Sequence, residues 1–403
     1  MTDSGPLFVV FLIGKIIQWL SKTFNFGAGG TWPGEIALKI DPNILRKIAP
    51  KNIILVAGTN GKTTTSLMVK TLLENGEHRV IHNASGANLL NGVVSAILTS
   101  TAAVWGVFEV DENSLPIVLK FIKPKVIVLL NLFRDQLDRY GEVDTIADNW
   151  QTALSKVPKQ GCSLTVNADD PHLAWIGKNI GQKVFYFGLG DKRYFLPQPP
   201  HATDSLFCPH CSSRLVFAGH YISHLGEWHC PKCDFTHPKL DLSAKDIKSP
   251  LDGVYNLYNV LAATLTAKTL GLSIDLSRFA PAFGRAEEIN GAKILLSKNP
   301  AGFNESLRTI LDSKHRGPIL LVLNDRIPDG RDVSWIWDVD FELLQKYPFP
   351  IYVSGDRAFD LALRLKYAAV PVEIKEELNA SWILPTYSAM LDIRKKLTGK
   401  KIL

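Results

Sequence analysis

The chain has 403 residues, 46% of them hydrophobic, and its 45 basic and 39 acidic side chains leave a net charge of +6. That length is too great for one typical domain, and that hydrophobic fraction excludes an intrinsically disordered chain. The small positive excess suits anionic ligands such as nucleotides, but it does not indicate nucleic-acid binding.

The first predicted element is a helix over residues 8–20, which are apolar except at Lys15 and Gln18. This segment is too short to span a bilayer, and it lacks the cleavage site of a secretory signal. Two interpretations stay open: a helix packed on the body of the protein, or a helix lying on the inner face of the membrane. Residues 1–40 are therefore assigned to an N-terminal helix and loop.

A phosphate-binding loop is the strongest motif in the sequence. An apolar run over residues 53–57 ends in Gly58-Thr59-Asn60-Gly61-Lys62-Thr63-Thr64, and a helical pattern follows. In such loops, backbone N–H groups of the turn and of the helix N-terminus surround a phosphate. Lys62 is placed to reach the β- and γ-phosphates of ATP, and the Thr63 hydroxyl to bind Mg²⁺. Val56 stands where the general motif has its first glycine.

Strands and helices alternate after this loop. We expect strands at residues 79–82, 103–110 and 124–130, and helices at residues 89–98 and 115–121. The alternation predicts a parallel sheet with helices on both faces and a site at the carboxyl ends of the strands. Glu109 ends one strand and is placed to hold Mg²⁺ with Thr63, although an acidic turn explains it equally well. Asn131 ends the next strand and begins a charged, amide-rich loop.

A second series of strands and helices begins at Lys293. Its expected strands are 294–296, 319–323, 351–353, 372–374 and 382–384, and its helices 303–311, 341–347, 359–367 and 387–397. We interpret it as a smaller Rossmann-like domain. A helical pattern over residues 252–270 precedes it. The segment Asp329-Gly330-Arg331-Asp332 follows a strand, and a functional role there is weighed equally against an ordinary turn.

The cysteines point to a metal site. Four of the five form two C-x-x-C pairs, Cys208 with Cys211 and Cys230 with Cys233. This spacing predicts a tetrahedral Zn²⁺ site, and four thiolates leave no open position, so the metal should be structural. Nearby histidines could replace a ligand, but ordinary surface histidines explain them too. The cysteine usage fits a reducing compartment, so we expect a cytoplasmic protein.

The charge of this metal-binding segment argues against nucleic-acid contact. Between residues 208 and 233 the chain carries Arg214 and Lys232 against Glu227, which is nearly neutral. Binding to a phosphate backbone would therefore be weak. The fifth cysteine, Cys162, is predicted to be a buried small hydrophobic residue.

The order of these motifs resembles the Mur ligases, ATP-dependent amide-bond-forming enzymes of peptidoglycan synthesis that are related to folylpolyglutamate synthetase. The resemblance is carried by the phosphate loop, Glu109, and the segments 131–138, 167–171, 255–263 and 284–285. The cysteine pairs and the segments 298–303 and 329–338 narrow it to the MurT family, whose members work with a GatD glutamine amidotransferase subunit.

The resemblance implies a fold. Residues 41–288 would form a central P-loop ATPase domain, with a Cys₄ zinc ribbon inserted at about residues 204–238. Residues 289–403 would form the C-terminal Rossmann-like domain. The N-terminal UDP-binding domain of most Mur ligases is expected to be absent.

The resemblance also implies a reaction. ATP would phosphorylate the α-carboxyl of D-glutamate in the lipid II stem peptide, and ammonia from a GatD-like subunit would convert the acyl phosphate to D-isoglutamine. By the same resemblance, Asn256, Asn259 and Arg285 would contact the nucleotide, and Thr63 and Glu109 would hold Mg²⁺. Asp332 would complete the Cys–His pair of the partner as a triad. The competing hypotheses are a stand-alone Mur-type amino-acid ligase of cell-wall or folate type, and a zinc-ribbon module acting on nucleic acid.

Overall fold

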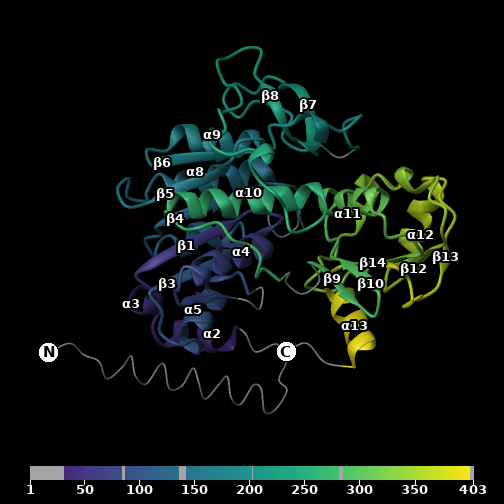
Figure 1. Cartoon of the computed structure of the whole chain (residues 1–403), viewed down its shortest axis with the longest axis horizontal. Coiled ribbons are helices and arrows are strands. Elements are labelled where there is room, and N and C mark those ends of the chain that lie inside the picture. The colour runs from purple at the N-terminus through teal and green to yellow at the C-terminus, as the bar shows by residue number, and fades with distance from the viewer. Residues whose placement is uncertain (1–30, 84–86, 136–141, 202, 281–284, 400–403) are drawn as a thin grey trace.

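The structure is a computed structural model that describes all residues except 1–30, 84–86, 136–141, 202, 281–284 and 400–403. The helix predicted over residues 8–20 lies outside the described part. Within that part, two α/β units lie side by side, and a small β-hairpin stands above the larger one (Figure 1). No helix in these ranges has both the length and the apolar character that crossing a membrane requires.

The larger unit is built on a parallel sheet that has, in the described residues, the strand order β2-β3-β1-β4-β5-β6. Its strands are β1 (Asn52–Ala57), β2 (Val80–His82), β3 (Trp105–Val110), β4 (Val126–Leu129), β5 (Ser163–Asn167) and β6 (Lys183–Phe187). Its helices are α2 (Trp32–Ile40), α3 (Ile44–Ile48), α4 (Lys62–Asn75), α5 (Leu90–Thr99), α6 (Ser114–Val118), α8 (Val143–Leu154), α9 (Pro171–Asn179) and α10 (Val254–Thr269). The predicted parallel sheet is therefore confirmed.

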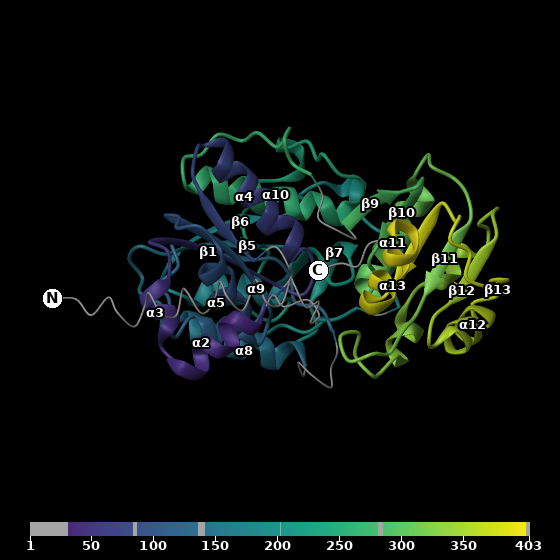
Figure 2. The same cartoon turned by 90° about the horizontal axis from the view of Figure 1, so that it is seen from below.

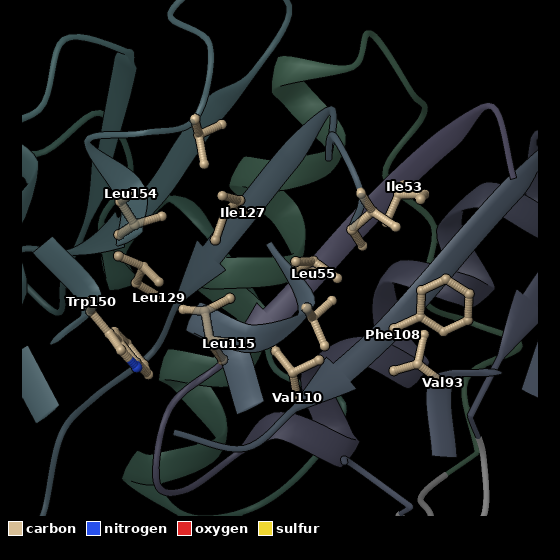
Figure 3. Close-up of a cluster of buried hydrophobic side chains, with 14 of the residues drawn as sticks. Ile53, Leu55, Val93, Phe108, Val110, Leu115, Ile127, Leu129, Trp150 and Leu154 are labelled. Carbon is tan, nitrogen blue, oxygen red and sulfur yellow. The ribbon is translucent and has the colours of Figure 1, made fainter. Parts of the chain in front are cut away.

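Both faces of this sheet are covered, which explains the unbroken apolar run of β1. Ile53 and Leu55 point to one face, where they join a cluster that includes Trp150 of α8 (Figure 3). Ile54 and Val56 point to the other face, against α4 and α10. Figure 2 shows α4 and α10 on one side of the strands and α2, α5 and α8 on the opposite side. Strands buried on both faces are apolar at every position rather than at alternate ones.

The hairpin above the sheet consists of β7 (Val216–Ile222) and β8 (Leu225–His229), which pair antiparallel. It lies between α9 and α10 in the sequence and carries the cysteine pairs at its base. Two 3₁₀ turns flank it, η1 (Lys192–Tyr194) and η2 (Ala244–Asp246).

The second unit is a sheet with the order β13-β12-β11-β14-β10-β9 in the described chain. Its strands are β9 (Arg285–Ile289), β10 (Ala292–Leu295), β11 (Ile319–Val322), β12 (Ile351–Ser354), β13 (Glu373–Ile374) and β14 (Trp382–Pro385). Its helices are α11 (Pro300–Asp312), α12 (Ala358–Tyr367) and α13 (Tyr387–Thr398), with 3₁₀ turns η3 (Ser334–Asp338) and η4 (Phe341–Leu344). The segment 341–347, expected as a helix, forms only the η4 turn.

The strand β9 was not anticipated. It pairs antiparallel with β10, so the second sheet begins before residue 289, where we expected the C-terminal domain to start. Asn290 and Gly291 join the two strands with φ values of +52° and +83°. Positive φ at both central residues is typical of the tight hairpin turn that Asn-Gly favours. That dipeptide was the sequence signal for the hairpin.

Substitution of Gly291 should destabilise the second unit through backbone strain alone. A Cβ at Gly291 would have no atom within 4 Å, so packing does not oppose it. We expect Gly291→Ala to lower the free energy of unfolding by about 1–2 kcal/mol, because the left-handed region is unfavourable for alanine. Gly291→Asn should cost less, since asparagine tolerates this region. Urea unfolding of both variants checks this, and equal losses would contradict it.

Candidate active site

The phosphate loop lies between β1 and α4, at the carboxyl edge of the larger sheet. Gly58 and Gly61 have φ values of +146° and +87°, which favour glycine. At Gly61 a side chain is also excluded sterically, since a Cβ there would lie 2.2 Å from Asn259 Oδ1. Val56 is a buried residue of β1, so the strand itself occupies the position where the general motif has glycine.

The Lys62 side chain folds back over this loop and is largely buried. Its Nζ donates to the carbonyl oxygens of Gly58 at 2.6 Å and Thr59 at 3.0 Å, and it lies 3.6 Å from Glu112 Oε2. Burial raises the pKa of Glu112, but the charges of Lys62 and Lys298 outweigh it and bring the pKa below its usual value. Glu112 therefore holds the ammonium at the loop. Glu112 was not among the predicted site residues.

Thr63 and Glu109 meet as expected. The Thr63 hydroxyl donates to Glu109 Oε2 at 2.7 Å, and Glu109 is 1% exposed. The Asn83 amide fixes the end of β3, because it donates to the Glu109 carbonyl at 2.8 Å and accepts from its N–H at 3.0 Å. Hydroxyl and carboxylate oxygens are ligands that Mg²⁺ prefers, so this pair could hold the ion.

Asn131 shapes the loop from the neighbouring strand. Its Oδ1 accepts from the Asn60 N–H at 2.8 Å, and its Nδ2 donates to the Asn60 carbonyl at 3.1 Å. Thr59 N–H also donates to the Asn131 carbonyl at 2.9 Å. In this structure Asn131 thus holds loop backbone, and residues 136–141 of the segment that follows it lie outside the described part.

Asn256 and Asn259 lie on α10 and face the loop. Thr65 Oγ1 donates to Asn259 Oδ1 at 3.3 Å, and Asn259 Nδ2 donates to Asn256 Oδ1 at 3.1 Å. Both asparagines line a cavity beside Gly61 and Thr64. Arg285 begins β9, but its side chain lies outside the described part of the structure.

The second unit contacts the loop directly. Asn299 and Asn60 exchange hydrogen bonds through their side-chain amides, at 3.1 and 3.3 Å. Lys298, next to Asn299, forms an ion pair with Asp135 of the larger unit. Asn299 also caps α11 by accepting from the Gly302 N–H at 2.9 Å. No pattern in the sequence indicates these contacts, because they join residues far apart in the chain.

Asp332 lies at the junction of the two units and is exposed. Its carboxylate accepts from the Ser334 N–H at 2.8 Å and the Ser334 hydroxyl at 2.9 Å, and these bonds hold its pKa below the usual value. It lines a cavity with Asp135 and Lys298. Asp329 differs from Asp332 because it is buried, and its carboxylate accepts a hydrogen bond from the Ser388 N–H at the start of α13. Asp329 therefore has a structural role.

The four cysteines of the hairpin base come together. Sγ of Cys208 lies 3.7 Å from Sγ of Cys233, Sγ of Cys211 lies 3.4 Å from Sγ of Cys230, and all four lie within 4.8 Å of one another. Sulfurs around a tetrahedral ion with bonds of about 2.3 Å are about 3.8 Å apart, so this cluster could hold a metal.

The nearby histidines and the fifth cysteine lie outside the four-cysteine cluster. In the described residues no histidine joins the metal-type cluster. His210 stacks on Trp175 at 4.9 Å, and His224 contacts Asp170. Cys162 is buried, which raises the pKa of its thiol to about 12. Its predicted role as a small buried residue is confirmed.

Comparisons with known proteins give a consistent result. The Mur ligase middle domain matches residues 56–267, and the MurT ligase C-terminal domain matches residues 296–390. Among solved structures, a pseudomurein peptide ligase type C from Methanothermus fervidus has a TM-score of 0.69 at 21% identity, covering 88% of this chain and 80% of that chain. MurF from Acinetobacter baumannii has a TM-score of 0.63 at 17% identity, covering 89% and 79%. These two structures show the fold.

Relatives with higher sequence identity narrow the family assignment of this chain. The subunit MurT of lipid II isoglutaminyl synthase (glutamine-hydrolyzing) from Staphylococcus aureus (strain COL) is 37% identical over 375 residues, covering 86% of this chain and 84% of that protein. The same subunit from Streptococcus pneumoniae is 31% identical over 425 residues, covering 94% of each. The chain therefore belongs to the Mur ligase family and, within it, to the MurT subunits.

Proposed function

We propose that this chain is the ATP-using subunit of a lipid II isoglutaminyl synthase. It would convert the α-carboxyl of D-glutamate in the lipid II stem peptide to the amide of D-isoglutamine. The observation that carries this proposal is the assembly of Lys62, Thr63 and Glu109 at one sheet edge, in a chain 37% identical to a MurT subunit. We place the reaction in the cytoplasm, at the inner face of the membrane where a lipid-linked substrate would be presented.

The chemistry follows from the weakness of a carboxylate as an acyl donor. An oxygen of the substrate carboxylate would attack the γ-phosphorus of ATP, and ADP would leave. Ammonia would then attack the carbonyl carbon of the acyl phosphate, and inorganic phosphate would depart with the C–O electron pair. Lys62 and the backbone N–H groups of residues 58–64 would bind the phosphates. A Mg²⁺ ion held by Thr63 and Glu109 would supply positive charge to the transferring phosphoryl group.

The contacts between the two units support protection of the acyl phosphate from water. Asn299 reaches the phosphate loop through Asn60, and the Lys298–Asp135 ion pair lies beside this contact. Residues from both units thus surround the loop. Excluding water would prevent hydrolysis of the intermediate before ammonia arrives.

The ammonia would come from a GatD-like glutaminase subunit. Asp332 is exposed, and its two hydrogen bonds from Ser334 orient its carboxylate. A carboxylate so placed could orient the histidine of a partner's Cys–His pair, as the third member of a triad. The cavity that Asp332 lines also contains Lys298 and Asp135, so the partner would dock next to the contact between the units.

The metal of the cysteine cluster is proposed to be Zn²⁺ with a structural role. The sulfur spacing fits four Zn–S bonds, and Zn²⁺ favours tetrahedral thiolate coordination. A closed shell of four thiolates leaves no position for substrate. The ion would stabilise the hairpin, which has too few residues for a core of its own.

Glu109→Gln should abolish most of the ATP-dependent activity. The amide keeps the shape of the side chain but removes the charge that Mg²⁺ needs, so we expect ammonia-driven amidation to fall about 100-fold or more. The assay measures amidated lipid II formed from ATP and ammonium. Glu74→Gln, an exposed substitution on α4, is the control. An unchanged rate for Glu109→Gln would contradict the magnesium assignment.

Asp332→Asn should affect amidation with glutamine as the ammonia source but not amidation with free ammonium. Asparagine can still accept from Ser334, so the local turn is kept, but it cannot stabilise a protonated histidine. We expect glutamine-driven amidation by the complex to fall at least about 100-fold, with ammonium-driven amidation unchanged. The control is Asp338→Asn, which lies in the same cavity.

The outcome distinguishes the alternatives. Unchanged glutaminase activity of the complex with Asp332→Asn would disprove the triad role. Incorporation of an amino acid by the isolated chain, in place of ammonia, would favour a stand-alone Mur-type ligase.

Loss of one cysteine ligand should release the metal. We expect Cys230→Ser to reduce bound zinc from one ion per chain to none, and to lower the unfolding temperature, because zinc binding drives the folding of small ribbons. Atomic emission measures the zinc content, and calorimetry measures the unfolding temperature. Cys162→Ser, which lies outside the cluster, should keep the zinc. Full zinc content in Cys230→Ser would show that the cluster does not bind the ion.

A further inference from the structure

The turn of the β7–β8 hairpin reaches the cavity beside the phosphate loop. This turn comprises residues 222–225. Ile222 and Leu225, its first and last residues, are paired across the hairpin and are 4% and 1% exposed. Both line the cavity that also contains Gly61, Thr64 and Asn259. If the hairpin served only its own stability, it would not need apolar side chains in this cavity.

A buried carboxylate holds the turn against the strand ends of the larger sheet. Asp170 Oδ2 accepts from the Leu132 N–H at 2.8 Å and lies 3.3 Å from Nε2 of His224, which is fully buried in the turn. Leu132 follows Asn131, which shapes the phosphate loop through Asn60. One oxygen therefore fixes both the hairpin turn and the segment that carries the loop.

The adjacent Asp169 holds β8 and the segment that follows it. Its carboxylate contacts His237 Nε2 at 2.8 Å and accepts from the Tyr258 hydroxyl of α10 at 2.6 Å. Its carbonyl accepts from the Gly226 N–H at 3.0 Å and the Trp228 indole at 3.2 Å. The hairpin and α10, which carries Asn256 and Asn259, are thus joined through one residue.

The cysteine cluster connects to the same network. Trp228 packs in one apolar cluster with Cys208, Cys230 and Phe235, while its indole bonds to Asp169. Phe235 also packs edge-on against Trp175 of α9 at 5.2 Å. A metal bound by the cysteines would therefore stabilise β8, the strand that follows the turn.

The cavity has the composition that a nucleotide base requires. The turn offers an apolar surface from Ile222 and Leu225, and α10 offers amide groups from Asn256 and Asn259. A flat base has apolar faces and a hydrogen-bonding edge, and ligand pockets combine apolar walls with a few placed polar groups. The phosphate loop borders the same cavity, so its occupant would be the nucleoside part of a bound triphosphate.

We propose that the β7–β8 turn forms a wall of the base site, with Ile222 and Leu225 in contact with the base of ATP. The cysteine ribbon then contributes directly to nucleotide affinity, in addition to its own stability. This inference rests on the proposed function, because that function identifies the bound nucleotide as ATP.

Two probes test the proposal. ATP carries a base and phosphates, whereas inorganic tripolyphosphate carries only the part that the phosphate loop binds. For Ile222→Ala in the full chain, we expect the Kd for ATP to rise about tenfold through lost apolar contact. The Kd for tripolyphosphate should be unchanged. Lys62→Ala should weaken both probes. The matched control on the same hairpin is Val216→Ala, at an exposed position, and it should change neither Kd.

A second variant guards against unfolding of the hairpin. Ile222→Phe keeps an apolar, strand-favouring residue but reduces the space for the base. We expect weaker ATP binding with normal metal content and unfolding temperature. Equal weakening of both probes by Ile222→Ala, or unchanged ATP binding in both variants, would overturn the inference. A wild-type chain that binds neither probe would overturn the proposed function itself, and the inference with it.

Discussion

Parallel pairing of β1 with β3 on one side and β4 on the other places three strand ends next to each other. The phosphate loop follows β1, Glu109 lies near the end of β3, and Asn131 follows β4. In an open parallel sheet the carboxyl ends of the strands form the natural binding edge. The Thr63–Glu109 pair and the hydrogen bonds between Asn131 and Asn60 depend on this order.

Two adjacent carboxylates extend this edge to the inserted hairpin. Asp169 and Asp170 are fully buried and meet a ring nitrogen of His237 and of His224. Burial raises the pKa of Asp170, but the charge and hydrogen bond of His224 outweigh it and bring the pKa below its usual value. An ionised, buried carboxylate with several partners fixes geometry more strictly than apolar packing does. The hairpin is thus oriented by the same residues that order the strand ends.

Much of this architecture was predictable because it is encoded locally. The phosphate loop, the cysteine pairs and the apolar strands are contiguous patterns, and the structure brings Thr63 to Glu109 and the four cysteines together as expected. The sequence signal for the Asn290-Gly291 hairpin was also local, but the hairpin was not predicted because the strands beside it are short.

Contacts between distant segments could not be predicted in the same way. The Lys298–Asp135 and Asn299–Asn60 contacts join residues of different units, and no spacing in the sequence indicates them. Glu112 carried no predicted role, because nothing in the sequence around it indicates that it is buried beside Lys62. Asp169 and Asp170 stood in a motif of the family, but nothing local tied them to the histidines of the hairpin.

The amide pair between Asn60 and Asn299 would make any separation of the two units easy at this point. Both groups are neutral, and each donates and accepts one hydrogen bond. When the units separate, water can replace both bonds, and a hydrogen bond between neutral groups contributes only about 0.5–1.5 kcal/mol net. Such a contact aligns the units without holding them shut. The amide pair itself should be little affected by salt or moderate pH change, unlike the Lys298–Asp135 ion pair beside it.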